Sequence, residues 1–206
     1  MGTILLAYST WNGQTRRIAE RIAATLRGSG RTVDVVEVAA GGPAQIDMAR
    51  YDAAIVAASI RMGKHAPPIV AFVRQHRDRL AAIPNMFITV SLSAYGVVDP
   101  TANADRKRRA GAEVEKTIAR FVKDTGWTPN ETHSVAGALL YLQYGFFLRM
   151  LMRFISGVVG ASTDMSRNHE YTDWAAVERC ANEFAARCEV KAGAAGETPK
   201  RLATAR

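Results

Sequence analysis

The sequence predicts one α/β domain in which five parallel strands form an open, doubly wound sheet with helices on both faces. The chain has 206 residues, of which 48% are hydrophobic, and this is enough for one packed core. Short apolar runs bounded by turn residues alternate with helical patterns along most of the chain. The runs are almost uniformly apolar, which is typical of parallel strands that are covered by helices on both sides.

The predicted strands are, in order, the runs TILLAY, TVDVVEV, AAIVAAS, MFITVSL and HSVAGALL. After the first run, Ile18, Ile22 and Leu26 recur every four residues, which gives a helix one apolar stripe for packing on a sheet. Similar helical patterns follow the third and fourth runs, and a last helix is expected to begin near Thr172. Strand and helix therefore alternate as a parallel sheet requires.

The last helix also sets the predicted end of the domain. Residues 1–188 form the domain, and residues 189–206 are expected to be a disordered basic tail, because their small and charged residues show no apolar periodicity. Cys180 and Cys188 are eight positions apart in a helix, or roughly 12 Å, which is too far for a disulfide. Few cysteines and an N-terminus without a signal-peptide pattern favour a reducing, cytoplasmic setting.

Residues 141–161, YLQYGFFLRMLMRFISGVVGA, form an insert between the fifth strand and the last helix. Arg149 and Arg153 interrupt it, so no uncharged run reaches the roughly 18 residues that a spanning helix needs. A helix here places Arg149, Arg153 and Ser156 on one narrow stripe, which suits a helix lying in a membrane interface. The alternative is a core or dimer-contact helix whose arginines reach outward. The residues expected at the interface are Phe146, Phe147, Arg149, Met150, Leu151, Arg153 and Phe154.

The turn between the first strand and the first helix reads YSTWNGQT. Ser9, Thr10, Asn12 and Thr15 offer side-chain donors, and Gly13 lets the backbone approach a bound group closely. The helix that follows points its unpaired N–H groups and positive dipole end at the same place. The turn has no lysine and matches neither GxxxxGK[ST] nor GxGxxG, so a phosphate monoester held by neutral donors is expected. The alternative is an ordinary helix cap.

The loops after the third and fourth strands read ASIRMGKH and SLSAYG, and parallel strands bring both to the same edge of the sheet as the first turn. Each loop has a serine for the edge of a flat ring, a bulky side chain for its face and a glycine that permits an unusual turn. These residues are Ser59, Met62 and Gly63 in the first loop, and Ser93, Tyr95 and Gly96 in the second.

The net charge of +8 and the pI of about 9.9 indicate an anionic partner: nucleic acid, an acidic membrane surface or an acidic small molecule. The basic run DRKRR, residues 105–109, has no interleaved aromatic residues and no recognisable nucleic-acid-binding module. We therefore expect a solvated helical face that adds to lipid attraction, and no nucleic-acid partner.

The three loops together resemble the flavodoxin arrangement for flavin mononucleotide (FMN). More closely, the opening STWNGQT, ASIRMG (58–63), AGAL (136–139), the insert and YTDW (171–174) resemble the menaquinone-dependent protoporphyrinogen oxidase family of bacteria. This resemblance runs from about Ile4 to Phe184. It implies a flavodoxin-like sheet of order 2-1-3-4-5 and an FMN enzyme that oxidises protoporphyrinogen IX to protoporphyrin IX in haem synthesis.

The resemblance also implies site residues. Arg61 is a candidate catalytic residue that pairs with a substrate carboxylate, although a surface salt bridge is the alternative. His65 is a candidate for moving a proton, and a solvated loop histidine is the alternative. Met62, Lys64 and His65 depart from the family's third loop, where a tyrosine and histidines occur. The other histidines lack ligand-like spacing, so no metal is expected.

The cofactor-binding residues expected in the three loops are Ser9, Thr10, Trp11, Asn12, Gly13, Gln14, Thr15, Ser59, Ile60, Arg61, Met62, Gly63, Ser91, Leu92, Ser93, Ala94, Tyr95 and Gly96. Within the resemblance, electrons pass to a membrane quinone, menaquinone or ubiquinone, which the apolar insert helps the domain to reach. A basic surface suits anionic lipid headgroups and the propionates of a porphyrinogen. The protein is therefore expected at the inner face of the cell membrane, peripherally associated.

Two other activities remain open at this stage. An NAD(P)H:quinone reductase is the enzymatic alternative, and a flavodoxin-type electron carrier is the non-enzymatic one, although such carriers are typically acidic. A docking protein that has lost its flavin is a third reading. The sequence does not decide between a monomer and a homo-oligomer.

Overall fold

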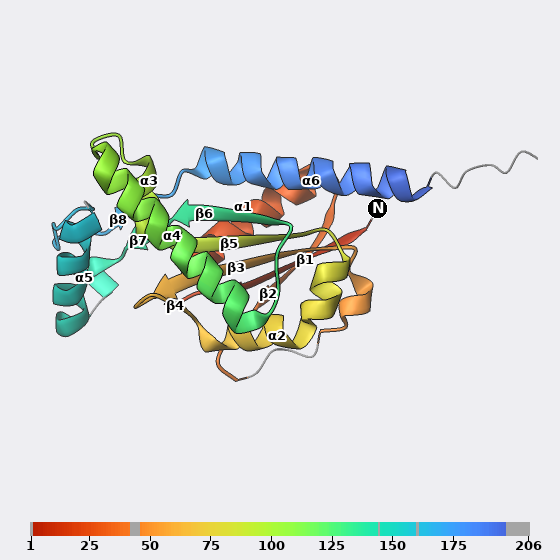
Figure 1. The fold of residues 1–206 in the computed structure, drawn as a ribbon, viewed down its shortest axis with the longest axis horizontal. Coiled ribbons are helices and arrows are strands. Elements are labelled where there is room, and N and C mark those ends of the chain that lie inside the picture. The colour runs from red at the N-terminus through yellow and green to blue at the C-terminus, as the bar shows by residue number, and fades with distance from the viewer. Residues whose placement is uncertain (1, 42–45, 144, 160, 197–206) are drawn as a thin grey trace, which may run out of the picture.

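The computed structural model describes residues 2–41, 46–143, 145–159 and 161–196, and its centre is a twisted sheet with helices on both faces (Figure 1). Within these residues, the parallel strands run in the order β2-β1-β3-β5-β6. Numbered among themselves, they follow the order 2-1-3-4-5, which confirms the predicted fold class. Their bounds are β1 (Thr3–Ser9), β2 (Thr32–Glu37), β3 (Ala53–Arg61), β5 (Asn85–Ser91) and β6 (Glu131–Ala136).

Three short strands were not predicted. β4 (Lys64–His65) folds back antiparallel on the end of β3, and β7 (Ala138–Leu139) pairs with β8 (His169–Glu170) in a separate small sheet. The expected fifth strand, HSVAGALL, is therefore divided between β6 and β7. The division falls at Gly137, whose carbonyl accepts a hydrogen bond from the Tyr171 N–H at 3.1 Å.

Two layers of helices cover the sheet. One core cluster joins α1 and α6 to one face, and the other joins α2 and α4 to the opposite face. Along β1, Ile4, Leu6 and Tyr8 belong to the first cluster, whereas Leu5 and Ala7 belong to the second. Because both faces of each central strand are buried, the strands are uniformly apolar. The helices are α1 (Gln14–Gly28), α2 (Pro67–Ala82), α3 (Ser93–Val98), α4 (Ala104–Thr125), α5 (Phe146–Val159) and α6 (Trp174–Gly196), with short turns η1 (Met48–Arg50) and η2 (Tyr141–Gln143).

The last helix differs from its predicted bounds. α6 begins at Trp174 and continues to Gly196, so residues 189–196 are helical rather than part of a disordered tail. Residues 191–196 read KAGAAG, in which the alanines favour a helix and the glycines disfavour it. Residues 197–206 of the expected tail lie outside the described residues. Cys180 and Cys188 form no disulfide, as predicted.

The basic run 105–109 lies in the first turns of α4. The guanidinium of Arg106 pairs with Asp99, whose carboxylate is fully buried, and Arg108 pairs with Asp105 at 2.7 Å. Hydrogen bonds from Thr101 and the Arg106 guanidinium hold the pKa of Asp99 below its usual range. Part of the positive charge of this run is therefore compensated within the fold.

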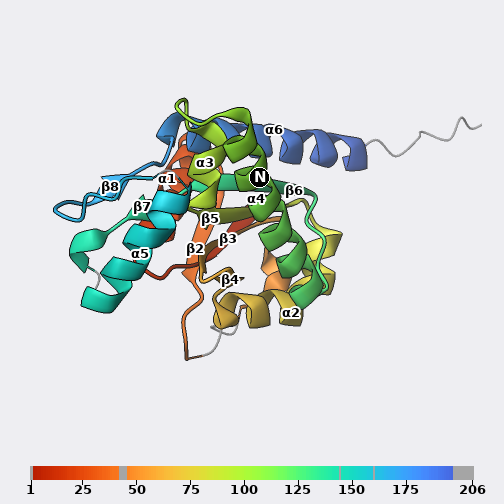
Figure 2. The ribbon, with the colours of Figure 1, turned by 60° about the vertical axis from the view of Figure 1, so that its left-hand side comes forward.

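The insert forms α5, which lies beside β7 and β8 at one end of the sheet (Figure 2). Among the described residues, no helix combines the length and the apolar character needed to cross a bilayer.

Candidate functional site

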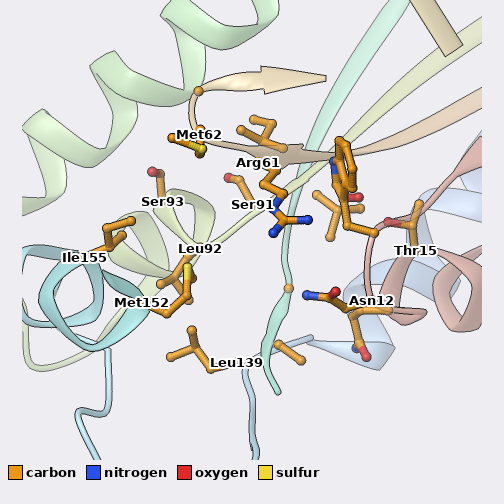
Figure 3. A pocket seen from close by; sticks show the side chains of 18 of the residues that line it. Asn12, Thr15, Arg61, Met62, Ser91, Leu92, Ser93, Leu139, Met152 and Ile155 are labelled. Atoms are coloured by element: carbon orange, nitrogen blue, oxygen red, sulfur yellow. The ribbon is translucent and has the colours of Figure 1, made fainter. Parts of the chain in front are cut away.

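A cavity of about 350 Å³ lies at the carboxyl ends of β1, β3 and β5, where the three predicted loops meet (Figure 3). Asn12 and Thr15 stand on one side of it, and Leu92, Met152 and Ile155 stand on the other. The predicted residues that line it are Thr10, Trp11, Asn12, Gln14, Thr15, Ser59, Ile60, Arg61, Met62, Gly63, Ser91, Leu92 and Ser93. The wall at Asn12 and Thr15 is thus rich in hydroxyl and amide groups, and the facing wall is formed mainly by apolar side chains, with Ser93 among them.

The first loop offers hydrogen-bond donors to this cavity. Gly13 precedes α1 with a left-handed φ of 84°, and no side chain of the described chain caps the helix at this position. The Gly13 N–H donates to Thr10 Oγ1 at 2.9 Å, which folds the turn back on itself. Gln14 and Thr15, the first residues of α1, line the cavity, so the positive end of the helix dipole, which favours an anion, lies beside it.

Two buried hydroxyl groups in this cavity have no hydrogen-bond partner among the described residues. They are Thr15 Oγ1, in the first turn of α1, and Ser59 Oγ, near the end of β3. A buried hydroxyl without a partner costs about 1–3 kcal/mol, so native proteins rarely leave one unpaired unless a ligand or water supplies the bond. The cavity wall is therefore set up to bind a polar group.

The loop after β3 is a two-residue hairpin turn. Met62 and Gly63 have φ values of 51° and 71°, and Arg61 and Lys64 pair across the turn. Positive φ at both central residues is the geometry that tight hairpins prefer, and it is costly for a residue with a side chain. The turn holds Met62 at the cavity with 79% of its surface exposed.

Five predicted cofactor-binding residues do not line the cavity: Ser9, Gly13, Ala94, Tyr95 and Gly96. Ala94, Tyr95 and Gly96 do not line the cavity because the chain after β5 forms the helix α3 directly after Leu92. Ser91 Oγ accepts a hydrogen bond from the Ala94 N–H at 3.1 Å, and Gly96 is buried in the helix without a positive φ. The Tyr95 ring packs on Tyr171, which directly follows β8, with 4.2 Å between ring centroids.

His65 does not reach the cavity either. The β4 hairpin turns it back into the core, where its ring packs edge-on against Phe87 and Phe121 and its Nε2 lies 3.0 Å from Thr89 Oγ1. Burial lowers the pKa of His65 to about 4. The prediction that His65 exchanges protons at the site is therefore not supported by its position, because this imidazole is neutral at pH 7 and enclosed by aromatic rings.

Arg61 does line the cavity, and its side chain points into it (Figure 3). Its Cζ lies 5.1 Å from the centroid of the Trp11 ring, within cation–π range. The surface salt bridge that was the alternative for Arg61 is not formed with any described residue. The Arg61 guanidinium thus lies over an indole ring at the cavity and forms no ion pair with a described carboxylate.

Sequence reasoning did not assign a second group of lining residues to the site: Val90, Glu113, Thr117, Gly137, Ala138, Leu139, Met152 and Ile155. Leu151, which was expected at the membrane interface, also lines the cavity. Gly137, Ala138 and Leu139 belong to the AGAL motif, which was noted for resemblance but not assigned to the site. Glu113 and Thr117 lie on α4 in an ordinary amphipathic pattern, and no local signal marks them.

The α5 helix has two different sides. Ser156 is fully buried, and its Oγ donates to the Met152 carbonyl at 2.6 Å and lies 2.9 Å from the Tyr141 hydroxyl. Arg149, Arg153 and Ser156 were expected on one polar stripe of a helix in a membrane interface, but Ser156 faces the protein interior, while Arg153 is exposed. The outward side is instead apolar, and it exposes Phe146 by 72%, Phe147 by 87%, Met150 by 46%, Leu151 by 41% and Phe154 by 72%.

A hydrogen-bond network fastens the small β7–β8 sheet to the first loop. Gln14 Nε2 donates to Glu170 Oε1 at 2.9 Å and to Thr172 Oγ1 at 2.8 Å. Arg17 donates to Gln14 Oε1 and to Glu170 Oε2, both at 3.1 Å. The cavity wall formed by β7 is thereby held in place against the start of α1.

Comparisons with known proteins agree with this fold. The family described as "Flavodoxin domain" matches residues 5–166. A protein of Leishmania major named protoporphyrinogen IX dehydrogenase (quinone) is 36% identical over 183 residues, which are 88% of this chain and 74% of that protein. A protein of the same name from Escherichia coli K12 is 32% identical over 181 residues, which cover 88% of this chain and 93% of that protein.

Solved structures give the fold alone. A cysteine-to-serine variant of flavodoxin from Pseudomonas aeruginosa aligns with a TM-score of 0.53 at 12% identity, covering 91% of this chain and 99% of that one. Oxidised flavodoxin 1 from Bacillus cereus aligns with a TM-score of 0.51 at 13% identity, covering 90% and 98%. Because the flavodoxin domain matches most of the chain and the two relatives described above are more than 30% identical to it, the chain belongs to the family of quinone-dependent protoporphyrinogen IX dehydrogenases.

Proposed function

We propose that this protein is an FMN-dependent enzyme of haem biosynthesis that oxidises protoporphyrinogen IX to protoporphyrin IX and passes the electrons to menaquinone or ubiquinone. The cavity carries this proposal, because it joins a wall rich in hydroxyl and amide groups, with unpaired hydroxyls at Thr15 and Ser59, to an apolar wall on α5. The names of the relatives support the same substrate and the same class of acceptor.

The residues present fit FMN. The uncapped start of α1 and the unpaired Thr15 hydroxyl suit the phosphate, and the unpaired Ser59 hydroxyl suits a polar edge of the ring. Bound FMN supplies the redox chemistry, which no side chain of the cavity can perform. The protein groups bind and orient it, and Leu139, Met152 and Ile155 exclude water from the facing wall.

Arg61 is proposed to bind a propionate of the substrate. It is the cationic side chain that lines the cavity among the described residues, and a guanidinium pairs with a carboxylate through two parallel hydrogen bonds. The net charge of +8 attracts the dianionic substrate over a longer range.

The outward side of α5 is proposed to lie in the interface of an anionic membrane, at the inner face of the cell membrane. Its exposed phenylalanines supply apolar area, Arg153 is exposed beside them, and the net charge of the chain favours anionic headgroups. The inward side of the same helix lines the cavity, so a quinone dissolved in the bilayer reaches the cofactor without crossing bulk water.

Membrane docking is tested by flotation on anionic vesicles without detergent. Phe147→Asp with Phe154→Asp places two charges on the exposed side of α5 and is expected to abolish flotation. Ala175→Asp with Ala186→Asp is the matched control, because both alanines are exposed on α6. Equal flotation of the wild type and the α5 variant would contradict the docking proposal.

The proposed activity is tested by mixing the FMN-loaded protein anaerobically with protoporphyrinogen IX and a quinone, and by following porphyrin fluorescence. We expect fluorescence to rise only when the protein, FMN and the quinone are all present. A rise no greater than that of the FMN-free control would overturn the assignment. Reduction of bound FMN by NADPH without porphyrinogen would instead favour an NAD(P)H:quinone reductase.

A further inference from the structure

The stack of Arg61 on Trp11 spans two loops of the cavity. Trp11 comes from the turn after β1, and Arg61 is the last residue of β3. The Arg61 Cζ lies 5.1 Å from the Trp11 ring centroid, and both residues line the cavity. Trp11 is 43% exposed, so its ring is not a core side chain that an arginine happens to touch.

We propose that Trp11 is a positioning residue that holds the Arg61 guanidinium at the cavity with its N–H edge free, so that the enzyme selects porphyrinogens with ionised propionates over neutral ones. This inference rests on the proposed function, since it assumes that a porphyrinogen binds beside Arg61.

The chemistry of the two groups is compatible. Stacking on an indole uses the flat face of the guanidinium, whereas a carboxylate binds the N–H groups along its edge. Arg61 can therefore stay on Trp11 while it binds a carboxylate. No described residue supplies that carboxylate to Arg61, so its edge is left for a ligand.

Elsewhere in this protein, arginines that lie over an indole ring also bind a carboxylate. Arg17 and Arg21 stack on Trp174, with their Cζ atoms 5.2 and 5.4 Å from the ring. While stacked, Arg17 pairs with Glu170 at 3.1 Å and Arg21 pairs with Glu178 at 2.7 Å. An arginine on an indole thus binds a carboxylate at the same time in this fold. At Trp11 the same pair occurs at the cavity without its carboxylate.

The position of Arg61 in the fold leaves its side chain without other restraint from the described residues. It ends a strand and directly precedes the two-residue turn at Met62 and Gly63, so its exposed side chain has few packing neighbours to fix it. A free arginine side chain loses much rotamer entropy when it binds, and an indole that already restrains the guanidinium lowers this cost. Removing the ring is therefore expected to weaken carboxylate binding while Arg61 itself is retained.

The test compares protoporphyrinogen IX with its dimethyl ester, which has the same ring and no carboxylates, in one detergent. For the wild type we expect KM for the acid to be lower than for the ester by about tenfold or more, the usual range for a hydrogen bond to a charged group. Arg61→Gln should remove this preference. Trp11→Leu should reduce it roughly two- to fivefold, as expected for one cation–π contact.

A double variant and a binding assay complete the test. The double variant Trp11→Leu with Arg61→Gln should lose no more of the preference for the acid than Arg61→Gln loses alone, because Trp11 acts only through Arg61. Trp174→Leu breaks the matched stack away from the cavity, and any general damage it causes should affect acid and ester equally. Binding of the two product porphyrins, measured by fluorescence on FMN-loaded and FMN-free protein, should give the same acid-to-ester ratios without turnover.

Two outcomes would overturn the inference: a wild type that binds and oxidises acid and ester equally well, or a Trp11→Leu protein that keeps the full preference. If neither substrate is oxidised, the proposed function fails. The binding ratios then still decide whether Trp11 positions Arg61 for carboxylates.

Discussion

Replacing Thr15 by valine should have opposite effects on the FMN-free and FMN-bound protein. Thr15 is fully buried in the first turn of α1, and its Oγ1 has no hydrogen-bond partner among the described residues. Valine has nearly the same shape but no hydroxyl. The FMN-free protein should therefore gain about 1–3 kcal/mol of unfolding free energy, since the cost of the unpaired group is removed.

FMN binding should change in the other direction. If the Thr15 hydroxyl donates to the phosphate, its removal loses a hydrogen bond to a charged group, worth about 1.5–3 kcal/mol. This corresponds to a Kd for FMN that is roughly 10- to 100-fold higher. Urea unfolding of the FMN-free protein gives the first quantity, and quenching of FMN fluorescence during titration gives the second.

Thr89→Val is the matched control for both measurements. Thr89 is also fully buried, but its Oγ1 is bonded to His65 Nε2 at 3.0 Å, away from the cavity. Its replacement leaves His65 unpaired, so it should destabilise the FMN-free protein and leave FMN affinity unchanged. If Thr15→Val destabilised the FMN-free protein as much as Thr89→Val and left the Kd for FMN as it was, the Thr15 hydroxyl would have no role in binding.

Three further predictions follow from the backbone and the core. Met62→Gly should raise the unfolding free energy by about 1 kcal/mol. Met62 has a φ of 51° and is 79% exposed, so the relief of backbone strain outweighs the lost packing. A urea midpoint equal to or lower than that of the wild type would refute this prediction. Gly13→Ala should lower the unfolding free energy by about 1 kcal/mol through its φ of 84° alone, since a Cβ there meets nothing within 4 Å, and it should weaken FMN binding. The pKa of His65 is about 4 in the folded protein and near 6.5 in the unfolded chain. Between these pH values the unfolded chain binds more protons than the folded protein. The unfolding free energy should therefore fall by about 3 kcal/mol as the pH drops from 6.5 to 4. Urea titrations over this range should show a weaker pH dependence in His65→Phe than in the wild type, and an unchanged slope would contradict the assignment.

The parallel sheet was predictable because its signals are local and repeated. Each central strand is a continuous apolar run, and the alternation of runs and helices leaves few topologies for one domain of this length. The short strands carry no such signal. A two-residue strand such as β4 exists because Arg61 and Ile60 offer it partners, and nothing in KH alone marks it as a strand.

His65 and Ser156 illustrate why side-chain positions were harder to predict than elements. His65 follows a turn in the sequence and so looked like a loop residue, but the hairpin directs it beneath Phe121, which is 56 positions further along the chain. Ser156 shares a helical stripe with arginines, yet the Tyr141 hydroxyl lies within hydrogen-bond distance and keeps it inward. In both cases a contact distant in sequence decided the orientation. The cavity residues of α4 and α5 were missed for the same reason.

The two-sided α5 helix explains why a flavodoxin-like enzyme serving a quinone would need an insert at all. The partner of an electron carrier approaches the cofactor from water, so an open edge of the sheet is sufficient. A quinone stays in the bilayer, and the domain has no described helix that spans it. With Met152 and Ile155 toward the cavity and Phe147 and Phe154 outward, α5 would place the cavity about one helix diameter, roughly 10 Å, from the lipid. Under the proposed function, one short helix thereby closes the active site and brings it to its acceptor.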